Sequence, residues 1–535
     1  MKNQEQKTPE NKQSKLFLKL AVIIIAVSAL AYFAYRMLKV SFLPTKYTLI
    51  SVAVCGLIIV TTAFFLLKKK KRPDKYTDIL LGVLNLVLSA CLVVIPMGVN
   101  KVEDTIDTLF ELPKTGTSDM IFVALATDNI SSPEQLFNDK VAVQQTDDLD
   151  NQAYAINYLE IEYKRELPVS PYEDVVEAID DLLAGKCRFV LLNQSYFDSI
   201  VDNEAYETLP DKTKVVYKVE ILYDLEDVYN NAKVTEESFN ILVSGADNYG
   251  KIKNIYRSDV NILVTVNPKT KQILVTSIPR DAYVKVPCWN NAYDKLTHAS
   301  AAGWRSPKGV KCSMKTVEKF LDTKIDFYIL INFSSVINIV DTIGGITIEN
   351  PYDFTYSYKP KTFFPKGTLN LDGRDTLYYV RERKSSKKGD MGRNEHQIIV
   401  LKAMLKKILQ PSMLSKANQL FVELSNSYQT NFSSEQISAL IKMQLSDLAS
   451  WDVLNQSLQG QTARKLSAIL SKYQVFSMTV VFPNQLKQAK KNIKAVLSGN
   501  ILESAELPEG IKQKITNDTP KKKPKKTKPT EPTTP

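Results

Sequence analysis

The chain has 535 residues, of which 44% are hydrophobic, and it carries a formal net charge of +11 at pH 7. This length predicts several domains, and the positive charge indicates an anionic partner such as phospholipid, nucleic acid or an acidic polymer. Five cysteines and two histidines are too few for a disulfide framework or a multi-histidine metal site. The chain also lacks a P-loop, a dinucleotide-binding glycine fingerprint, and the common zinc-peptidase and serine-hydrolase motifs.

Three apolar stretches near the N-terminus predict membrane-spanning helices. They cover about Leu16–Leu38, Tyr47–Leu67 and Ile79–Met97, and each is close to the ~20 residues that a helix needs to cross a bilayer. Lysines are concentrated before the first stretch and in the loop Lys68–Lys75, so the positive-inside rule places the N-terminus and this loop in the cytoplasm. We therefore expect a multi-pass plasma-membrane protein with three spans, whose residues after about 100 lie outside the cell.

The next segment alternates between strand-like and helical patterns. Met120–Ala126 and Val141–Gln145 are typical of strands, whereas Tyr172–Ala184 is helical in pattern. The alternation predicts a small extracellular α/β accessory domain. Its sequence contains no motif with a chemistry of its own, so an accessory or interaction role is the plain interpretation.

A second α/β pattern follows, with the runs Val260–Val266 and Ile273–Ile278 around a turn and a long helix from Arg393 to Leu409. Further helical segments come next, with one strand-like run at Val475–Phe482, and the chain ends in a Lys/Pro/Thr-rich tail that cannot build a core. The predicted parts are a cytoplasmic N-terminus, three spans, an accessory domain, a catalytic domain, a helical extension and a disordered basic tail. These cover residues 1–15, 16–98, 110–230, 236–410, 411–515 and 516–535 respectively.

Two aspartates stand at the ends of strand-like runs in the second α/β pattern. Asp247 follows one run, and Asp259 begins the next one twelve residues later. Strand ends can bring both carboxylates to one edge of a sheet, where two carboxylates and ligand phosphates would hold Mg²⁺. Aspartates at such positions are also common as turn or cap residues, so the spacing alone leaves both interpretations open.

Five arginines also lie at the ends of predicted elements, namely Arg257, Arg280, Arg381, Arg383 and Arg393. In an extended segment, Arg381 and Arg383 would point to one side and Glu382 to the other. Arg393 and Gln397 lie one helical turn apart near a helix N-terminus, and both guanidinium groups and helix N-termini bind phosphate oxygens. A single arginine more often forms a weak surface salt bridge, but the set predicts a site for a di- or polyanion.

Eight short motifs occur in order between residues 239 and 409. They are Ser-Gly-Ala-Asp247, Arg257-Ser-Asp259, Ile-Pro-Arg280-Asp281, Asp294-Lys295-Leu-Thr-His298, Ile-Gly-Gly345-Ile, Leu-Asp372-Gly373, Val-Arg381-Glu-Arg383 and Gly-Asp390-x-x-Arg393-x-x-x-Gln397. In these motifs the chain resembles the LytR-CpsA-Psr family of bacterial cell-envelope proteins. The resemblance is strongest to its streptococcal capsule type, which has three spans and an extra domain before the catalytic one.

The resemblance implies an α/β sandwich (α-β-α) that encloses a hydrophobic pocket for a polyprenyl chain. It implies a Mg²⁺-dependent transferase, with Mn²⁺ as an alternative ion, that moves a glycopolymer from undecaprenyl diphosphate to peptidoglycan, and that hydrolyses the diphosphate when no acceptor is present. Asp247 and Asp259 would hold the metal, and the arginines and Gln397 would bind the diphosphate. The catalytic set that it implies is Arg257, Arg280, Asp281, Arg381, Arg383 and Arg393, in which Asp281 acts as a base or orients an arginine.

Several positions keep alternatives open. His396 stands where relatives commonly have an arginine, which bears on how the outer phosphate is held. Lys295 and His298 either orient the ligand or have a structural role. Cys288 and Cys312 bracket an insertion and can form a disulfide outside the cell, although a pair of free thiols is equally compatible with the sequence.

The resemblance further implies that the polymer is a capsular polysaccharide, a teichoic acid or a related wall glycan, and that the cell is a Gram-positive bacterium. The expected partners are the lipid-linked polymer, peptidoglycan, the bilayer and other capsule or wall assembly proteins, with no nucleic acid. Two other hypotheses are a membrane-bound regulator of transcription or capsule formation and a non-catalytic wall-binding scaffold. Against the regulator, the short cytoplasmic segments contain no helix-turn-helix pattern.

Overall fold

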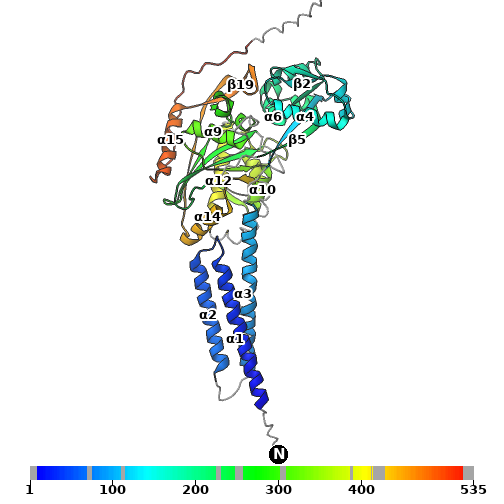
Figure 1. Ribbon diagram of the computed structural model, residues 1–535. Coiled ribbons are helices and arrows are strands. Elements are labelled where there is room, and N and C mark those ends of the chain that lie inside the picture. Colours follow the sequence, from blue (N-terminus) through cyan, green and yellow to red (C-terminus); the bar gives the residue numbers. More distant parts are fainter. Residues whose placement is uncertain are drawn as a thin grey trace, which may run out of the picture. The chain divides into compact units, whose positions relative to one another are not determined.

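The computed structural model describes residues 9–68, 75–109, 115–224, 230–246, 257–301, 309–385, 390–410, 413 and 428–521. They divide into two compact units (Figure 1). The first unit holds α1 (Pro9–Leu38), α2 (Thr45–Leu67), α3 (Lys75–Leu109) and α14 (Ser434–Asp447), and the second unit holds the remaining elements.

The first unit contains the three apolar helices that the sequence predicts. α1, α2 and α3 pack against one another and are each long and apolar enough to cross a membrane. Several of their polar side chains are paired, as expected for helices in an apolar medium: Thr62 donates to Asn85 over 3.1 Å, and Lys19 pairs with Asp78 over 2.6 Å. Helix α14 contacts α3, and its end accepts a hydrogen bond from the hydroxyl of Tyr47 at the carbonyl of Leu445.

The second unit begins with a five-stranded sheet. Its order is β3 (Val169–Tyr172), β2 (Val141–Gln144), β4 (Phe189–Asn193), β1 (Thr115–Leu125) and β5 (Thr213–Asp224). Strands β2, β3 and β4 are parallel, and β1 is antiparallel to its neighbours. The helices of this part are α4 (Leu149–Tyr163), α5 (Val175–Leu183), α6 (Gln194–Val201) and α7 (Leu209–Lys212). The predicted helix at Tyr172–Ala184 starts later than expected, because Tyr172 pairs in β3 and Asp174 caps α5 at the amides of residues 176 and 177.

A six-stranded sheet forms the centre of the second unit. Its order is β16 (Tyr428–Thr430), β11 (Phe327–Ile331), β6 (Phe239–Ala246), β7 (Ser258–Asn267), β8 (Gln272–Ser277) and β17 (Asp452–Ser457). The β-branched runs that predict a hairpin are β7 and β8, which pair antiparallel. Strand β11 is parallel to β6, so the carboxyl ends of these two strands meet at one edge of the sheet.

Helices cover both faces of this sheet. On one face, Leu242, Leu263 and Leu274 pack against α9 (Val310–Leu321) and α15 (Pro483–Leu497) in one hydrophobic core. On the other side lie α10 (Phe333–Thr342), α11 (Gly373–Arg381) and α12 (Asp390–Ile408), of which α12 contacts β8 and β17 and α10 contacts β11. The result is the α/β sandwich that the sequence predicts.

Smaller antiparallel ribbons connect these layers. They are β9 (Tyr283–Val286) with β10 (Ala292–Lys295), β12 (Ile346–Asn350) with β15 (Gly367–Leu371), β13 (Phe354–Thr355) with β14 (Phe363–Phe364), and β18 (Gly460–Ser467) with β19 (Ser471–Val481). A short helix α8 (His298–Ala301) follows β10.

The prediction of a helical extension at 411–515 is wrong for residues 452–467, whereas the strand-like run predicted at Val475–Phe482 is confirmed by β19. Residues 452–481 form strands β17, β18 and β19, and β17 completes the six-stranded sheet beside β8. The alternation of Val453 and Gln456 with more exposed neighbours is short, and the pairing with β8 comes from a segment about 180 residues away. Such a non-local partner leaves no signal in the local pattern.

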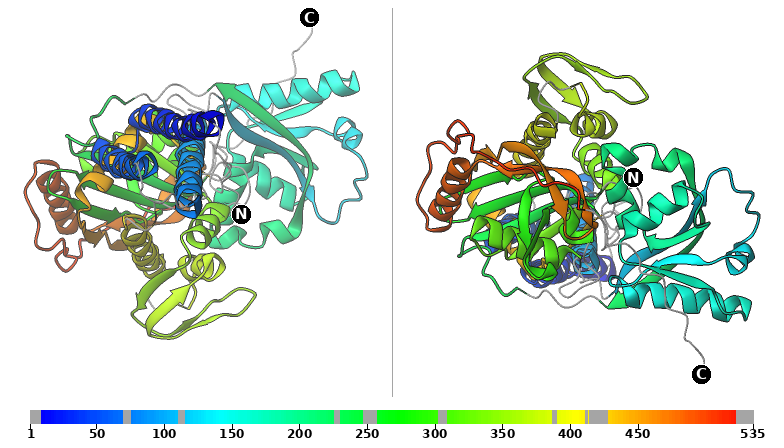
Figure 2. Two further views of the ribbon diagram at one scale, coloured as in Figure 1. Left: turned by 90° about the horizontal axis from the view of Figure 1, so that it is seen from below. Right: turned by 90° about the horizontal axis from the view of Figure 1, so that it is seen from above.

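One hydrophobic core joins the five-stranded sheet and its helices to the ribbons that contain β9 and β19. Val176 and Ile179 of α5 belong to the same buried cluster as Trp289 and as Phe476 and Met478 of β19. In Figure 2 the cyan elements of residues 115–224 accordingly lie beside the green sheet in both views. The predicted accessory domain is therefore packed directly onto the predicted catalytic domain.

Candidate active site

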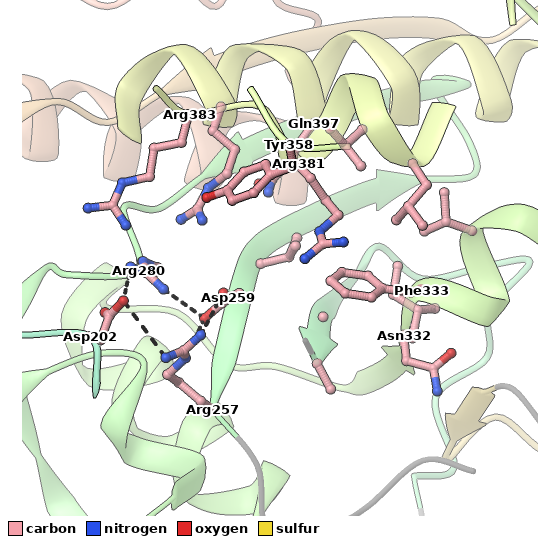
Figure 3. A pocket seen from close by; sticks show the side chains of 18 residues that line it. Asp202, Arg257, Asp259, Arg280, Asn332, Phe333, Tyr358, Arg381, Arg383 and Gln397 are labelled. Carbon is pink, nitrogen blue, oxygen red and sulfur yellow. Dashed lines mark hydrogen bonds and ion pairs between the residues drawn. The ribbon is translucent and has the colours of Figure 1, made fainter. Parts of the chain in front are cut away.

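A cavity of about 210 Å³ opens where the carboxyl ends of β6 and β11 meet the start of β7. Ligands of α/β proteins commonly bind at this edge of a sheet. Figure 3 shows arginine side chains approaching the cavity from both sides. The lining residues are Asp202, Gly245, Ala246, Arg257, Asp259, Val260, Arg280, Ile331, Asn332, Phe333, Val336, Tyr358, Leu377, Val380, Arg381, Arg383, Arg393 and Gln397.

The structure brings seven of the nine predicted site residues to this cavity. They are Arg257, Asp259, Arg280, Arg381, Arg383, Arg393 and Gln397. Asp281 does not line the cavity, but its carboxylate lies 3.1 Å from the Nζ atom of Lys295 and 3.7 Å from the Nε atom of Arg280. Asp247 lies outside the described residues.

One wall of the cavity, here called the paired wall, interleaves cations with carboxylates. Arg280 is 2% exposed, and its two terminal nitrogens donate to Asp259 over 3.0 Å and to Asp202 over 2.7 Å. Arg257 donates from Nε and Nη2 to the two oxygens of Asp259, over 3.0 and 3.3 Å. Because each buried charge has an opposite charge in contact, the wall avoids the large penalty of an isolated buried ion.

The pKa values of the acids in the paired wall reflect these contacts. Burial acts to raise the pKa of Asp202, but the guanidinium groups of Arg280 and Arg257 outweigh it and lower the pKa to about 2. Burial opposes ionisation of Asp259 and Asp281 as well, and the neighbouring Arg257, Arg280 and Lys295 hold the pKa of both carboxyls well below its usual range. All three acids are therefore ionised at neutral pH.

The other wall, here called the arginine wall, comes from α11, α12 and the loop between them. The sequence analysis places Arg381 and Arg383 in an extended segment, but Arg381 is the last residue of α11, and only Glu382 and Arg383 are past its end. Both arginines nevertheless line the cavity, and Glu382 points elsewhere, since it accepts from the hydroxyl of Ser357 over 2.8 Å. The guanidinium of Arg381 also lies 4.2 Å from the centre of the Phe333 ring, a cation–π contact.

Close helix packing positions this wall. Helix α11 begins at Gly373, where an added Cβ atom would lie 2.4 Å from the carbonyl oxygen of Ile337 in α10. Any larger residue would push the two helices apart. The amide of Gly373 also donates to Asp341 over 2.7 Å, which ties the start of α11 to α10. Arg393 and Gln397 follow on α12, one turn apart on the cavity side, as the sequence predicts.

Apolar residues form the remaining part of the lining. They are Val260, Ile331, Phe333, Val336, Leu377 and Val380. The apolar run Phe327–Phe333 is a strand only as far as Ile331, because Asn332 caps α10 through a hydrogen bond from the amide of Ser335. This early end turns Phe333 and Val336 into the cavity. The site is thus strongly cationic at one end and apolar at the other.

Asp202 is the charged lining residue that the sequence analysis does not predict. It follows α6 in the predicted accessory domain, far from the motifs in the chain, and a lone aspartate after a helix has no local signal of a site. The contacts of Lys295 and His298, for which the sequence left two roles open, differ. Lys295 is buried beside Asp281, whereas the Nδ1 atom of His298 lies 2.7 Å from Asp294, which supports a structural role for that histidine.

His396 belongs to the core and not to the cavity lining. It is fully buried among Tyr352, Phe354 and Tyr379, its Nδ1 atom lies 3.0 Å from the carbonyl of Tyr379, and its Nε2 atom lies 3.1 Å from the hydroxyl of Tyr352. Burial lowers the pKa of His396 to about 4. The imidazole is therefore neutral at pH 7 and takes no part in the arginine wall.

The described residues leave room for a metal at one carboxylate. Oδ1 of Asp259 accepts from Arg257 and Arg280, while Oδ2 accepts one hydrogen bond and keeps a lone pair for a cation. Within the described ranges no group of three or more His, Cys, Asp and Glu side chains could hold a metal ion. The donor set therefore fits a Mg²⁺ ion that takes few protein ligands and fills its other positions with phosphate and water oxygens.

A disulfide lies behind the paired wall. The structure joins Cys288, just after β9, to Cys312 in α9, with 5.9 Å between their Cα atoms. Both residues belong to the core that joins the five-stranded sheet to β9 and β19. The pairing that the sequence left open is therefore present.

A model of the LytR_cpsA_psr family matches residues 201–495, which is more than half of the chain. The match includes every residue that lines the cavity. Among curated proteins, the chain is similar to the polyisoprenyl-teichoic acid–peptidoglycan teichoic acid transferases TagU of Bacillus subtilis and Bacillus mycoides. The first is 35% identical over 196 residues, covering 37% of this chain and 60% of the relative, and the second is 36% identical over 207 residues, covering 38% and 64%.

Two solved structures are also similar to part of this chain. TagV of Bacillus subtilis is 27% identical and covers 49% of this chain and 98% of its own, with a TM-score of 0.41. A protein of Streptococcus agalactiae, gbs0355, is 29% identical and covers 54% of this chain and 96% of its own, with a TM-score of 0.42. The chain spans about 60% of the length of the first curated relatives that it matches.

Proposed function

The chain belongs to the LytR_cpsA_psr family, and from this premise we propose that it is a membrane-anchored transferase that attaches a wall glycopolymer to peptidoglycan outside the cell. Its donor would be the polymer linked to a polyprenyl diphosphate. The observation that carries the proposal is the composition of the cavity, in which five arginines and two aspartates meet six apolar side chains. An amphipathic lipid diphosphate has the same two parts.

The proposed reaction is a phosphoryl transfer. A hydroxyl of the peptidoglycan acceptor attacks the phosphorus that carries the polymer, the bond from this phosphorus to the bridging oxygen breaks, and polyprenyl monophosphate leaves. Negative charge increases on the bridging oxygen as this bond breaks. Arg280 and Arg257 of the paired wall and Arg381, Arg383 and Arg393 of the arginine wall stabilise that charge from fixed positions, which is the largest catalytic term in many phosphoryl transfers.

Asp281 has two possible roles, and its contacts favour one of them. Its carboxylate pairs with Lys295 and lies near Arg280, and these cations hold its pKa below the usual range. A carboxylate with so low a pKa is a weak base. We therefore assign Asp281 to the orientation of Arg280 and Lys295.

We propose Mg²⁺ as the cofactor, with Mn²⁺ as an alternative. Asp259 would hold it through Oδ2, and Asp247 would supply the second carboxylate. Bound there, the ion would neutralise charge on the diphosphate. The lysine-rich loop between α2 and α3 supports a cytoplasmic N-terminus, which puts the cavity outside the cell.

The polymer is a teichoic acid or a capsular polysaccharide. The curated relatives are named for teichoic acid, and the lipid diphosphate end of the donor is common to both polymers. The lipid-facing end of the cavity would hold the first isoprene units at Val260, Phe333 and Leu377.

The direct test uses the full-length protein in detergent with a short glycan linked to polyprenyl diphosphate, a peptidoglycan fragment and Mg²⁺. We expect release of polyprenyl monophosphate and a phosphodiester-linked product, both abolished by EDTA and by Arg280→Ala. Arg188→Ala is the matched control, because this arginine pairs with Asp139 in the first α/β domain and lies outside the cavity. Absence of release by the unmodified protein would refute the proposed function.

A further inference from the structure

Asp202 enters the active site from a different domain than the other lining residues. It directly follows α6 of the first α/β domain, and its side chain is 11% exposed. The carboxylate accepts from the Nη2 atom of Arg280 over 2.7 Å and lies 3.8 Å from Nη1 of Arg257 and 4.0 Å from Nζ of Lys295. One side chain of this domain thus contacts three cations of the paired wall.

A backbone group of the same helix acts beside it. The carbonyl of Asp198, in the last turn of α6, accepts from the Nη1 atom of Arg257 over 2.8 Å. The last four carbonyls of a helix have no partner within the helix, and the helix dipole makes this end negative. The carboxyl end of α6 therefore presents two acceptors, one from the backbone and one from Asp202, to two neighbouring arginines.

We propose that Asp202 is a positioning residue of the transferase, and that the first α/β domain thereby forms part of the active site. The inference rests on the proposed function and adds to it the role of this domain. Asp259 holds the guanidinium plane of Arg280 at one terminal nitrogen, and Asp281 lies 3.7 Å from its Nε atom. With Asp202 at the other terminal nitrogen, the plane is fixed before the diphosphate arrives.

The hydrophobic contacts around the same interface make this arrangement rigid. Val176 and Ile179 of α5 pack with Phe476 and Met478 of β19. Beside them, Asp180 accepts from the hydroxyl of Tyr206 over 2.6 Å and from the side chain of Gln474 over 3.1 Å. The position of α6 relative to Arg280 is therefore set by a packed core.

The charge of Asp202 has opposite effects on ligand affinity and on the orientation of Arg280, so the two effects can be measured separately. The paired wall holds Asp202, Asp259 and Asp281 against Arg257, Arg280 and Lys295, so its cations and carboxylates balance. Removing the charge of Asp202 makes the cavity more positive, which strengthens the attraction for a diphosphate. The same change releases one side of Arg280, so the orientation that turnover needs is lost.

The test compares Asp202→Asn with the unmodified full-length protein in the monophosphate-release assay. We expect kcat to fall by about 10- to 100-fold, the range that a small misplacement of a catalytic group produces, while KM for the lipid-linked donor stays the same or decreases. Asp202→Glu, which restores the charge, should recover part of the lost kcat and the original KM.

Asp180→Asn is the matched control. It removes one carboxylate from the same domain and the same interface but does not touch the arginines. We expect a lower Tm and unchanged kcat and KM per folded molecule.

The outcomes distinguish this inference from the proposed function. Normal kcat and KM in Asp202→Asn, with an active unmodified protein, would refute the inference and leave the proposed function standing. Equal losses of kcat in Asp202→Asn and Asp180→Asn, in proportion to lost folded protein, would also refute it in favour of a structural role. An unmodified protein that releases no monophosphate would refute both.

Discussion

The two walls of the cavity present arginines in opposite electrostatic settings. In the paired wall, Arg257 and Arg280 contact Asp202 and Asp259, and the charges balance. In the arginine wall, Arg381, Arg383 and Arg393 face the same cavity, and the two carboxylates among the described lining residues, Asp202 and Asp259, belong to the paired wall. The seven charged lining residues are five arginines and two aspartates, so the net positive charge resides in the arginine wall.

The difference indicates a division of roles. Buried ion pairs contribute little net stability but keep each partner in one orientation, and breaking such a pair leaves an uncompensated buried charge. The paired wall therefore combines orientation with folding stability. The side chains of the arginine wall line the cavity directly, and we expect them to contribute mainly to binding and turnover.

Substitution of Arg280 in the paired wall should reduce both the stability of the protein and its turnover. We expect Arg280→Ala to lower turnover by about 10³-fold, as loss of a transition-state donor does, and to reduce the free energy of unfolding by about 3–5 kcal/mol, because Asp202 and Asp259 lose a buried partner. Urea denaturation and the release assay measure the two effects. Full stability in this variant would contradict the description of the wall as paired.

Substitution in the arginine wall should affect activity alone. Arg383 is exposed, and we expect Arg383→Ala to lower kcat/KM by about tenfold or more, the effect of losing one charged hydrogen bond, with the free energy of unfolding unchanged within about 0.5 kcal/mol. Arg374→Ala, an exposed position on α11 that does not line the cavity, is the control. If Arg383→Ala and Arg374→Ala gave the same kcat/KM, the arginine wall would not bind the donor.

The disulfide behind the paired wall should act on stability and not on turnover. The double variant Cys288→Ser/Cys312→Ser opens a loop between residues 24 apart, and we expect the free energy of unfolding to fall by about 3 kcal/mol. The kcat per folded molecule should remain unchanged. Cys187→Ser, at a free cysteine, serves as the control, and a large loss of kcat in the double variant would show that the covalent link orients the paired wall.

The burial of His396 outside the arginine wall predicts a pH dependence of the free energy of unfolding. Its pKa is about 4 in the folded protein and about 6.5 in an unfolded chain, so the unfolded state takes up a proton first as the pH falls. The contribution of neutral His396 is fully present above about pH 6.5 and is lost progressively down to about pH 4, a total of about 3 kcal/mol.

The measurement is the difference in unfolding free energy between the unmodified protein and His396→Gln at pH 4.5 and pH 7. Taking the difference removes the contribution of other groups, such as Asp148, whose pKa burial raises to about 7. The unmodified protein should lose more stability on acidification than the variant. Parallel profiles would show that folding does not lower the pKa of His396, and would contradict its description as a neutral core residue.

Local pattern predicts much of this protein correctly. The apolar stretches within α1–α3, the hairpin β7–β8 and the helix that carries Arg393 and Gln397 each follow from short-range periodicity. Seven of the nine predicted site residues line one cavity, because polar side chains at the start of β7, after β8, at the end of α11 and on α12 converge where the parallel strands β6 and β11 end. The family motifs made this set recognisable.

Other features depend on partners that are distant in the chain. Strand β17 pairs with β8 across about 180 residues, and the core joining α5 to β19 spans about 300. Glu382 points away from the cavity because Arg381 ends a helix, and not because the segment is extended. No window of local sequence contains these relations, since β pairing and core packing are decided by what the fold brings alongside.

The sequence by itself determined the three apolar helices, the α/β character of the residues that follow them and the identity of the arginines. Periodicity, hydrophobicity and motif order are properties of neighbouring residues, and they survive without a structure. Only the tertiary structure decided which arginines are balanced by acids, and it drew one of those acids, Asp202, from the first α/β domain. Charge compensation depends on distances of a few ångströms between residues 78 positions apart, and only the folded chain sets such distances.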